Sequence, residues 1–337
     1  MNHVFIIAEI SANHGNSIEI VKQSILKAKE IGVDAVKIQT YKPDTITLDS
    51  DNEYFTIQDE NSLWNKRRLF DLYSEAYTPW EWHKELFEFA RDNNIILFST
   101  PFDFTAVDLL EECDNPIYKI ASFEINDIPL IKYAAKKMKP MIISTGIGTE
   151  EEISAAVSAC KEVGNEDITL LKCTSEYPAK VEDANLNMIG DLANKYNVKV
   201  GLSDHTIGNF VPLLSVGLGA KVIEKHFILD KSIGGPDATF SMSAEEFKDM
   251  VDQVRLAEKA LGEIDYSLSD KKLKSRHFRK SIFISKDVKK GELVSEENIK
   301  IVRPGVGLNP KYYYDILGKE FQEDYKYATP LDLEMIK

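Results

Sequence analysis

The feature that most constrains this chain is a repeated alternation between short apolar, β-rich runs and longer segments with helical periodicity. The β-rich runs are Val4–Ile10, Ala35–Thr40, Ile95–Thr100, Ile117–Ser122, Met141–Thr145, Ile168–Thr174, Val198–Ser203 and Val222–Phe227. Between them, segments such as Ile18–Ile31 space apolar residues three and four positions apart, as amphipathic helices do. Eight such units in about 260 residues predict a (β/α)8 TIM barrel rather than an open sheet, which needs fewer strands.

Polar side chains gather where the predicted strands end, as at Glu9, Lys37, Ser144 and His205. The carboxyl ends of all strands in such a barrel meet at one rim, where active sites of this fold lie. Alternation on a surface strand explains one or two polar sets. Eight converging sets predict a binding or catalytic site.

Two strand ends carry histidines, in Gly201-Leu-Ser-Asp-His205 and in Glu224-Lys-His226. A single histidine in such a place is more often a structural imidazole than a ligand. A pair on neighbouring strand ends can hold one divalent metal ion and leave coordination positions for water or substrate. His205 and His226 are therefore the candidate metal ligands.

Lys37 and Lys119 lie near strand ends that face the same predicted cavity. A buried ammonium group is costly unless it meets an anion, so the pair indicates a carboxylate or phosphate ligand. The alternative is that each lysine pairs with a structural carboxylate such as Glu124 or Glu224. The neutral donors expected to complete an anion site are Ser122, Ser144 and Ser203.

The composition of the 337-residue chain narrows the class of protein: 43% hydrophobic residues support a folded core. A formal charge of −14 argues against nucleic-acid and anionic-membrane binding, which need a basic face. The apolar Val4–Ala8 run is too short for a membrane span or signal peptide, which predicts a cytoplasmic protein. Cys113, Cys160 and Cys173 lack disulfide or metal spacing and are expected to be buried small hydrophobes.

Two segments depart from the barrel pattern. An aromatic insertion, 41–79, is expected to form either a satellite core or a substrate-covering lid. The barrel is expected to span residues 1–262. A polar linker, 263–280, should then lead to a separate small domain, 281–337, rich in short strands and turns.

The chain resembles the sialic acid synthase family, which condenses phosphoenolpyruvate with an amino-sugar aldehyde. The matching motifs include Ile7-Ala-Glu-Ile-Ser-Ala-Asn-His-Gly15, Asp34-Ala-Val-Lys-Ile-Gln39, Tyr118-Lys-Ile-Ala-Ser122, Ser144-Thr-Gly146, Cys173-Thr-Ser-Glu-Tyr-Pro178, Gly201-Leu-Ser-Asp-His-Thr206, Glu224-Lys-His226, Gly235-Pro-Asp237 and Arg303-Pro-Gly305. No single motif is specific. Taken together over most of the chain, these motifs are specific to the family.

The resemblance implies a TIM barrel followed by an antifreeze-like (SAF) β-rich domain that caps the partner's barrel in a domain-swapped homodimer. It implies a Mn2+ or Mg2+ ion, with Co2+ as an alternative, on His205 and His226. Phosphoenolpyruvate would contact Lys37, Lys119, Ser122, Ser144 and Ser203. The acylated aminosugar would contact Gln39, Phe102, Tyr177 and Asp237, with Arg303 supplied by the partner chain. The implied catalytic groups are Glu9, Glu224 and Lys119, and which of the two carboxylates handles the protons of the attacking water stays open.

Within the family, Leu69–His83 and Ser232–Met242 make the chain most similar to the pseudaminic acid branch. Other branches have histidine and asparagine where this chain has Ala238 and Ser175, which favours a 6-deoxy sugar with fewer hydroxyl groups. That branch uses 2,4-diacetamido-2,4,6-trideoxy-L-altrose, and the alternatives are N-acetylneuraminate and legionaminic acid synthesis. A non-catalytic sugar-binding barrel and a metal-dependent aldolase or hydrolase are less favoured, because neither needs so complete a charged rim.

Overall fold

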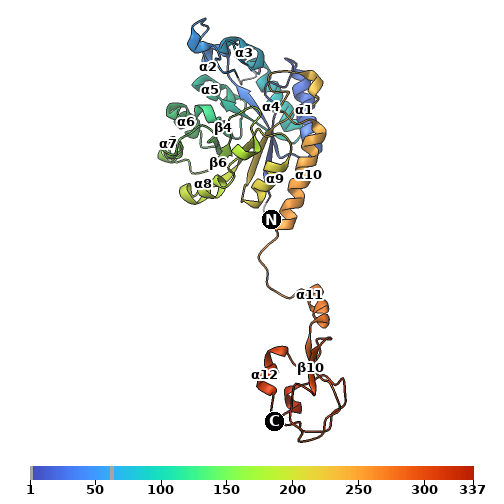
Figure 1. The fold of residues 1–337 in the computed structure, drawn as a ribbon. Coiled ribbons are helices and arrows are strands. Elements are labelled where there is room, and N and C mark those ends of the chain that lie inside the picture. The colour runs from blue at the N-terminus through green and yellow to red at the C-terminus, as the bar shows by residue number, and fades with distance from the viewer. Residues whose placement is uncertain (1–2, 61–63) are drawn as a thin grey trace. The chain divides into compact units, whose positions relative to one another are not determined.

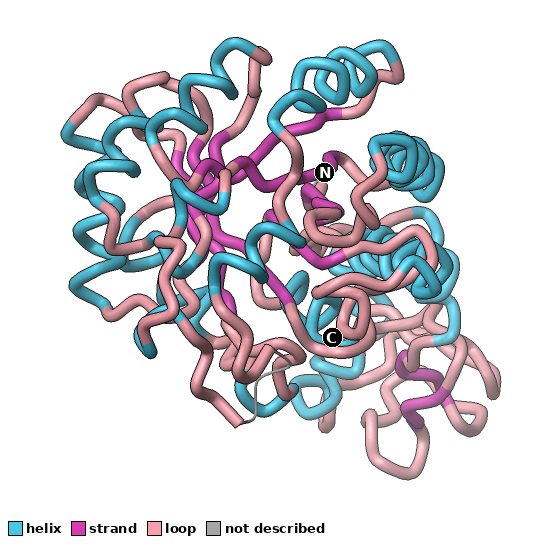
Figure 2. The backbone as a smooth tube through the Cα atoms, turned by 90° about the horizontal axis from the view of Figure 1, so that it is seen from above, coloured by secondary structure: helices cyan, strands magenta, loops and turns pink. Residues whose placement is uncertain are grey.

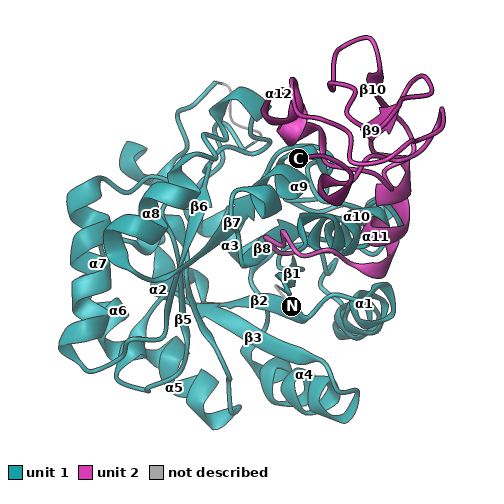
Figure 3. Cartoon of the chain, turned by 90° about the horizontal axis from the view of Figure 1, so that it is seen from below, with its two compact units in different colours: residues 1–262 teal, residues 263–337 magenta. Residues whose placement is uncertain are grey.

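The computed structural model describes residues 3–60 and 64–337. The chain divides into two compact units, Met1–Gly262 and Glu263–Lys337, which Figure 3 colours separately. Each unit has its own hydrophobic core. The two are therefore described in turn.

The first unit is a closed barrel of eight parallel strands in sequence order, ringed by helices as the views in Figures 1 and 2 show. The strands are β1 Phe5–Glu9, β2 Ala35–Thr40, β3 Ile96–Pro101, β4 Tyr118–Ile120, β5 Met141–Ser144, β6 Ile168–Cys173, β7 Lys199–Asp204 and β8 Val222–His226. The predicted (β/α)8 barrel is confirmed. Strand β4 is the main difference in bounds, because Ser122 begins a 3-10 turn instead of ending the strand.

A helix follows each strand and returns the chain to the start of the next one. These helices are α1 Ile18–Ile31, α4 Trp80–Asp92, α5 Phe104–Glu112, α6 Ile128–Ala135, α7 Glu150–Glu162, α8 Met188–Tyr196, α9 Phe210–Gly217 and α10 Ala244–Leu261. Local sequence sets their ends: the Ser17 side chain accepts from the Ile20 amide, and Gly32 terminates α1 at φ +88°. Helix α10 begins with a capping box between Ser243 and Glu246.

The interior of the barrel has an apolar layer with a polar layer above it. The apolar layer is a cluster containing Ile7, Ala35, Phe98, Ile142, Leu171 and Val222. Side chains two positions apart on a strand share a face, so the next inward residue on each of these strands lies one step nearer the rim. Those next residues are Glu9, Lys37, Thr100, Ser144, Cys173 and Glu224. The sequence therefore places its buried polar groups directly on a closed apolar floor.

Residue 201 on β7 must be glycine, because the backbone of β8 approaches it closely. A Cβ atom there would lie 2.3 Å from the Val222 carbonyl oxygen and 2.8 Å from a Leu171 methyl carbon. Any side chain at this position would push β7 away from β8. Ser203 and His205 follow on the same strand and loop, so their positions depend on this contact.

The aromatic insertion after β2 forms two short helices, α2 Pro43–Ile46 and α3 Leu69–Ala76, with an isolated bridge between Thr56 and Arg68. Its buried Tyr41 ring contacts Tyr73 and Phe102 at centroid distances of 5.7 and 5.2 Å. Another insertion residue, Trp64, contacts the Tyr177 ring at 5.9 Å. The segment thus forms a small aromatic core and also reaches a residue predicted to bind the sugar.

The second unit contains an antiparallel pair, β9 Ser281–Ile284 and β10 Ile299–Val302, and two short helices, α11 Asp270–Ser275 and α12 Tyr313–Ile316. Its core is built from residues such as Ile282, Val294 and Phe321. Helix α11 lies inside the segment predicted to be a plain polar linker. It forms there because the Ser269 side chain accepts a hydrogen bond from the Lys272 amide.

Candidate active site

The polar layer of the barrel brings the two predicted lysines together with two glutamates. Lys37 Nζ lies 2.5 Å from Glu9 Oε2 and 3.2 Å from Glu224 Oε1. Lys119 Nζ lies 3.8 Å from the same Glu224 oxygen and donates to Ser144 Oγ at 2.8 Å. All four ionisable groups are buried. Both lysines therefore face the barrel interior, and both have carboxylate partners of the kind that the alternative interpretation required: Glu9 and Glu224 for Lys37, and Glu224 for Lys119.

The two lysines differ in electrostatic compensation. Burial lowers the pKa of Lys37, but the attraction of Glu224 and Glu9 outweighs it, and the net pKa lies above the ordinary value. The pKa of Lys119 is lowered, because burial dominates and Lys37 repels it. Although burial raises the pKa of Glu224, both lysines outweigh that effect and keep its carboxyl below its usual range. Of the two lysines, Lys119 is thus the one whose charged form a bound anion would stabilise more.

Two of the three predicted serine donors contact these charged groups, and the third contacts another serine. Ser144 is bound by Lys119, and Ser203 Oγ donates to Glu224 Oε1 at 3.5 Å. Ser122 Oγ lies 2.5 Å from Ser175 Oγ. A Cβ atom on Gly146 would lie 2.2 Å from that Ser175 oxygen and 3.1 Å from Ser122 Oγ. The absence of a side chain at Gly146 therefore leaves room for the Ser122 and Ser175 hydroxyl groups to meet there.

The predicted metal ligands lie side by side at the rim. The ring centroids of His205 and His226 are 5.3 Å apart. His205 Nδ1 donates to the Thr174 carbonyl at 2.7 Å, so Nε2 is the ring nitrogen that a metal ion would use. His226 Nδ1 is buried without a hydrogen-bond partner among the described residues and lies 3.3 Å from Asp237 Oδ2.

This donor set fits a divalent ion held through two imidazole nitrogens. Within residues 3–60 and 64–337, no three histidine, cysteine, aspartate or glutamate side chains are grouped to hold one ion. A metal bound by His205 and His226 would accordingly need water or substrate oxygens for its remaining positions. The orphaned ring nitrogen of His226 is the observation that supports such a ligand.

Aromatic rings wall the rim on one side. Tyr177 stacks on His205 with ring centroids 4.3 Å apart, and Phe240 contacts both Tyr177 and His226, at 5.2 and 5.0 Å. Tyr177 and Asp237 therefore lie with the histidines, as expected for groups beside the metal. Phe240 joins this wall although no sequence motif singled it out.

Three predicted sugar contacts are less closely tied to this cluster. Phe102 follows β3 and contacts the Tyr41 ring. Gln39 is a half-buried residue of β2, two positions beyond Lys37 on the same face of the strand. Arg303 is exposed in the second unit, one residue beyond β10.

Two known families match successive parts of this chain. Residues 24–266 match the NeuB family, and residues 279–337 match the SAF domain. The chain belongs to the NeuB family. The resemblance inferred from the motifs is thereby confirmed, as is the small C-terminal SAF domain.

Characterised relatives of this NeuB-family chain match it along almost its whole length. It is 52% identical to the pseudaminic acid synthase of Campylobacter jejuni over 328 residues, covering 97% of this chain and 95% of that protein. It is 49% identical to the pseudaminic acid synthase of Helicobacter pylori over 333 residues, covering 98% and 97%.

A solved NeuB-family structure agrees with the fold. The N-acetylneuraminic acid (sialic acid) synthetase of Leptospira borgpetersenii, in complex with citrate, superposes with a TM-score of 0.72 at 32% identity. The superposition covers 81% of this chain and 90% of that one. No helix in the part of the chain that the structure describes is long and apolar enough to cross a membrane.

Two residues of this NeuB-family chain differ from what the sequence predicted: Glu124, named only as an alternative structural partner of a lysine, and Cys173, expected only as a buried small hydrophobe. Burial raises the pKa of Glu124 to about 7, with only partial compensation by Lys119. Cys173 is buried, as expected of a small hydrophobe, but faces the site: burial raises the pKa of its thiol, and His205, Lys119 and Ser175 together outweigh that effect and lower the pKa. The signal that could have found Cys173 was its inward position in the alternation of its strand.

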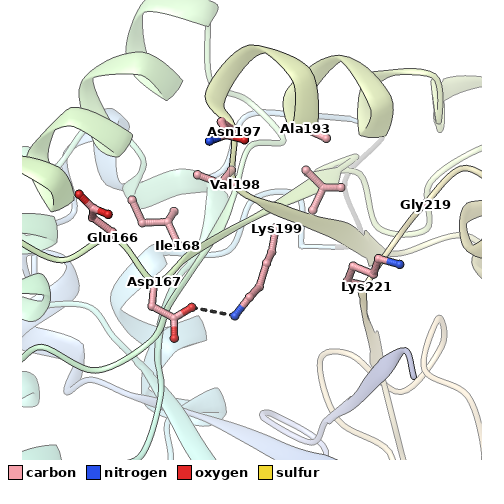
Figure 4. A pocket seen from close by; sticks show the side chains of 10 residues that line it. Glu166, Asp167, Ile168, Ala193, Asn197, Val198, Lys199, Gly219 and Lys221 are labelled. Carbon is pink, nitrogen blue, oxygen red and sulfur yellow. Dashed lines mark hydrogen bonds and ion pairs between the residues drawn. The ribbon is translucent and has the colours of Figure 1, made fainter. Parts of the chain in front are cut away.

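A hollow of about 480 Å3 lies at the opposite end of the barrel, where strands β6 and β7 begin. Figure 4 shows its lining, including the ion pair between Asp167 and Lys199. None of the predicted site residues lines it. In this fold that end supports stability, and chemistry is carried out at the other end, beyond the polar layer.

Proposed function

We propose that this chain is a pseudaminic acid synthase that condenses phosphoenolpyruvate with 2,4-diacetamido-2,4,6-trideoxy-L-altrose, yielding the nonulosonic acid and inorganic phosphate. The observation that carries the proposal is a site with two layers. Lys37 and Lys119 lie in the deeper layer, and His205 and His226 lie one strand step nearer the rim. Near full-length identity to two pseudaminic acid synthases supports the choice of branch. Ala238 and Ser175, in place of more polar residues, support a 6-deoxy sugar.

The deeper layer, which contains the lysines, suits the enol phosphate. Lys119 would bind its anionic groups, since its ion pair with Glu224 at 3.8 Å does not offset the burial of this ammonium. Ser144 and Ser203 lie beside Lys119 and Glu224, while Ser122 and the backbone at Gly146 form the neutral corner. Lys37 keeps Glu9 and Glu224 in place as well as facing the ligand.

The layer nearer the rim, which contains the histidines, suits the aldehyde. A divalent ion on His205 and His226, Mn2+ or Mg2+ with Co2+ as an alternative, would polarise the aldehyde oxygen as a Lewis acid. Tyr177 and Asp237 lie beside these histidines and would orient the sugar, with Phe102 and Gln39 farther around the rim. The methylene carbon of phosphoenolpyruvate forms the new C–C bond to the aldehyde carbon. Water then adds to the carbon bearing the phosphate, and cleavage of that C–O bond releases phosphate.

Proton handling falls to the buried carboxyl groups. Glu224 stays ionised beside two lysines, and Glu9 accepts the Ser11 amide at 2.7 Å while contacting Lys37, so either can accept a proton from the attacking water. Glu124, with a pKa of about 7, can carry a proton at neutral pH and is a third candidate. Lys119 assists by stabilising negative charge on the departing phosphate.

The assembly we propose is a domain-swapped homodimer in which Arg303 of one chain reaches the sugar in the partner's barrel. A planar guanidinium can grip acetamido and hydroxyl oxygens. Arg303 is exposed on the SAF domain, which suits a residue that acts on another surface. We place the enzyme in the cytoplasm, in keeping with its three free cysteines and its use of phosphoenolpyruvate.

The decisive experiment is phosphate release from phosphoenolpyruvate in the presence of the diacetamido-altrose. We expect release that EDTA abolishes and Mn2+ restores. His226→Ala should lower turnover by at least about 100-fold, because metal ligands and their supports are not replaceable at this site. Circular dichroism checks that the fold is retained, and undiminished turnover in a folded variant removes His226 from the mechanism.

A panel of three sugars tests the branch. The diacetamido-altrose is expected to give the highest kcat/KM, ahead of the mannose-type diacetamido sugar and N-acetylmannosamine. A higher kcat/KM for either of the other two would move the chain to the legionaminic or sialic acid branch. Phosphate release with none of the three, at saturating Mn2+, would reject the synthase proposal.

A further inference from the structure

Behind the two histidines lies a buried ion pair that the proposed chemistry does not use. Asp204 and Lys225 are register partners on β7 and β8, with 3% and 1% of their surfaces exposed. Each immediately precedes a histidine, so strand alternation points it away from the barrel interior that His205 and His226 face. The pair therefore sits on the outer side of the two strands that end in the proposed metal ligands.

The contacts of this pair bracket His205 on both sides. Lys225 Nζ contacts Asp204 Oδ2 and also donates to the Thr206 carbonyl at 2.5 Å. Thr206 in turn donates to Asp204 twice, from its amide at 3.1 Å and from its hydroxyl at 3.0 Å. Residues 204 and 206 are thus both tied to residue 225, which precedes His226. The Lys225 ammonium group therefore ties the residues on both sides of His205 to the strand that carries His226.

Stability does not by itself explain this arrangement. A buried ion pair gives little net stability compared with well-packed apolar residues of similar size, because both charges lose their hydration. The preceding outward residues of the same strands, Leu202 and Ile223, are apolar and buried. What hydrogen-bonded charges supply, and apolar contacts do not, is a fixed direction and spacing of the groups they join.

We propose that Asp204 and Lys225 form a positioning pair that sets the spacing and orientation of the two imidazoles for a divalent cation. The inference rests on the proposed function in assigning His205 and His226 to a metal. It adds that the affinity for the ion depends on residues that touch neither the ion nor the substrates. Thr206 relays the constraint from Lys225 to the backbone that follows His205.

The test measures Mn2+ binding to the metal-free full-length protein by electron paramagnetic resonance. We expect Asp204→Asn and Lys225→Met each to weaken Mn2+ binding by about 10–100-fold, the usual effect of losing an outer partner of a metal ligand. Phosphoenolpyruvate binding without metal should stay within about twofold of the native value. The double variant should be no weaker than the weaker single one, because the two residues act as a unit.

Arg255→Met is the matched control. Arg255 Nη2 pairs with Asp34 Oδ2 at 2.7 Å and Arg255 also donates to the Val4 carbonyl at 2.8 Å, at the end of the barrel where strands begin. It should lower Tm while leaving Mn2+ affinity within about twofold. Native-like Mn2+ affinity in Asp204→Asn, or equal weakening in Arg255→Met, overturns the proposal. Asp204→Asn keeps the side-chain shape and decides the question if Lys225→Met does not fold.

A second readout separates this inference from the proposed function. Failure of the native protein to bind Mn2+ would reject the metal assignment. The positioning role is still tested by nitrogen NMR of the His205 ring, whose Nδ1 donates to the Thr174 carbonyl. The Nδ1-protonated form should dominate in native protein and Arg255→Met and give way to mixed tautomers in Asp204→Asn. An unchanged His205 spectrum in Asp204→Asn overturns the positioning role.

Discussion

Lys37 and Lys119 carry the same charge in the same layer but have different surroundings. Lys37 contacts two carboxylates within 3.2 Å, whereas the nearest carboxylate oxygen to Lys119 is 3.8 Å away. An anion bound beside Lys119 will raise its lowered pKa towards the ordinary value. Lys119 is therefore the residue through which substrate binding couples to protonation.

This coupling gives a binding prediction. Phosphoenolpyruvate binding should take up protons at alkaline pH, and calorimetry in two buffers of different ionisation enthalpy measures the uptake. Lys119→Met should weaken binding by about 30-fold or more, since a charge-assisted contact contributes about 2 kcal/mol, and should abolish the uptake. Uptake that persists in Lys119→Met would assign the proton to another group.

Glu124 gives a stability prediction. Its folded pKa of about 7 lies above the reference value of 4.5, so the folded protein keeps a proton that the unfolded chain releases. The free energy of unfolding should therefore fall as pH rises from about 4.5 to 7. Each pKa unit corresponds to about 1.4 kcal/mol, so Glu124→Gln should be about 1–3 kcal/mol more stable at pH 8.

Urea denaturation of native protein and Glu124→Gln at pH 4 and pH 8 provides the measurement. Both forms are neutral at residue 124 at the lower pH, and their stabilities should nearly coincide there. A difference at pH 4 as large as that at pH 8 would mean that the amide changes packing instead of removing a charge.

Sequence reasoning located those residues whose side chains follow directly from strand alternation. Lys37, Glu224 and both histidines end apolar runs, and alternation alone turns them inward. It left open whether Lys37 would pair with a carboxylate such as Glu224, because that pairing joins strands distant in sequence. Phe240 was not predicted as a site residue, and Glu124 was predicted only as an alternative partner of a lysine, because neither position follows directly from strand alternation.

At the scale of elements, the barrel depends on close approach between β7 and β8. Gly201→Ala should destabilise the protein by about 1–3 kcal/mol or more, because its methyl group would meet the Val222 carbonyl oxygen, which cannot move aside. Gly190→Ala is the matched control. Nothing lies within 4 Å of a Cβ at that position in α8, so alanine should stabilise by about 0.5–1 kcal/mol.

Chemical denaturation of the two variants in parallel compares these effects. Equal changes in the free energy of unfolding would show that backbone conformation, not the contact with β8, decides the cost at residue 201. Because Gly201 precedes Ser203 and His205, a displaced β7 should also weaken Mn2+ binding in Gly201→Ala but not in Gly190→Ala.

Elements were predictable where periodicity was long. The first helix, Ile18–Ile31, and the strand Ala35–Thr40 follow the apolar pattern to the residue. Helix α11 was not predicted, because its charged run looks like a tether and only the Ser269 cap marks it as helical. In the insertion, scattered aromatic residues gave no period, so the helices α2 and α3 could not be placed.

At the scale of the whole molecule, the proposed swap makes each active site the product of two chains. Mixing an Arg303→Ala chain with a His205→Ala chain should restore activity that neither homodimer has. A heterodimer contains one site with an intact barrel and an intact capping domain, so recovery of up to about half of the native rate per dimer is expected.

Affinity tags of two kinds isolate the mixed dimers for this assay. Lack of recovery in verified heterodimers would mean that each chain uses its own SAF domain. A monomer at assay concentrations would remove the swap altogether. Arg303→Lys serves as a control, since a lysine retains charge but not the planar two-pronged geometry.

The apolar layer beneath the polar one has a kinetic consequence. Ile7, Phe98 and Leu171 close the barrel below the lysines, so molecules enter and leave by the rim alone. The proposed enol phosphate site lies one strand step, about 6–7 Å, deeper than the histidines. A sugar seated above would block the only exit. Turnover should therefore be ordered, with the enol phosphate first in and the inorganic phosphate last out.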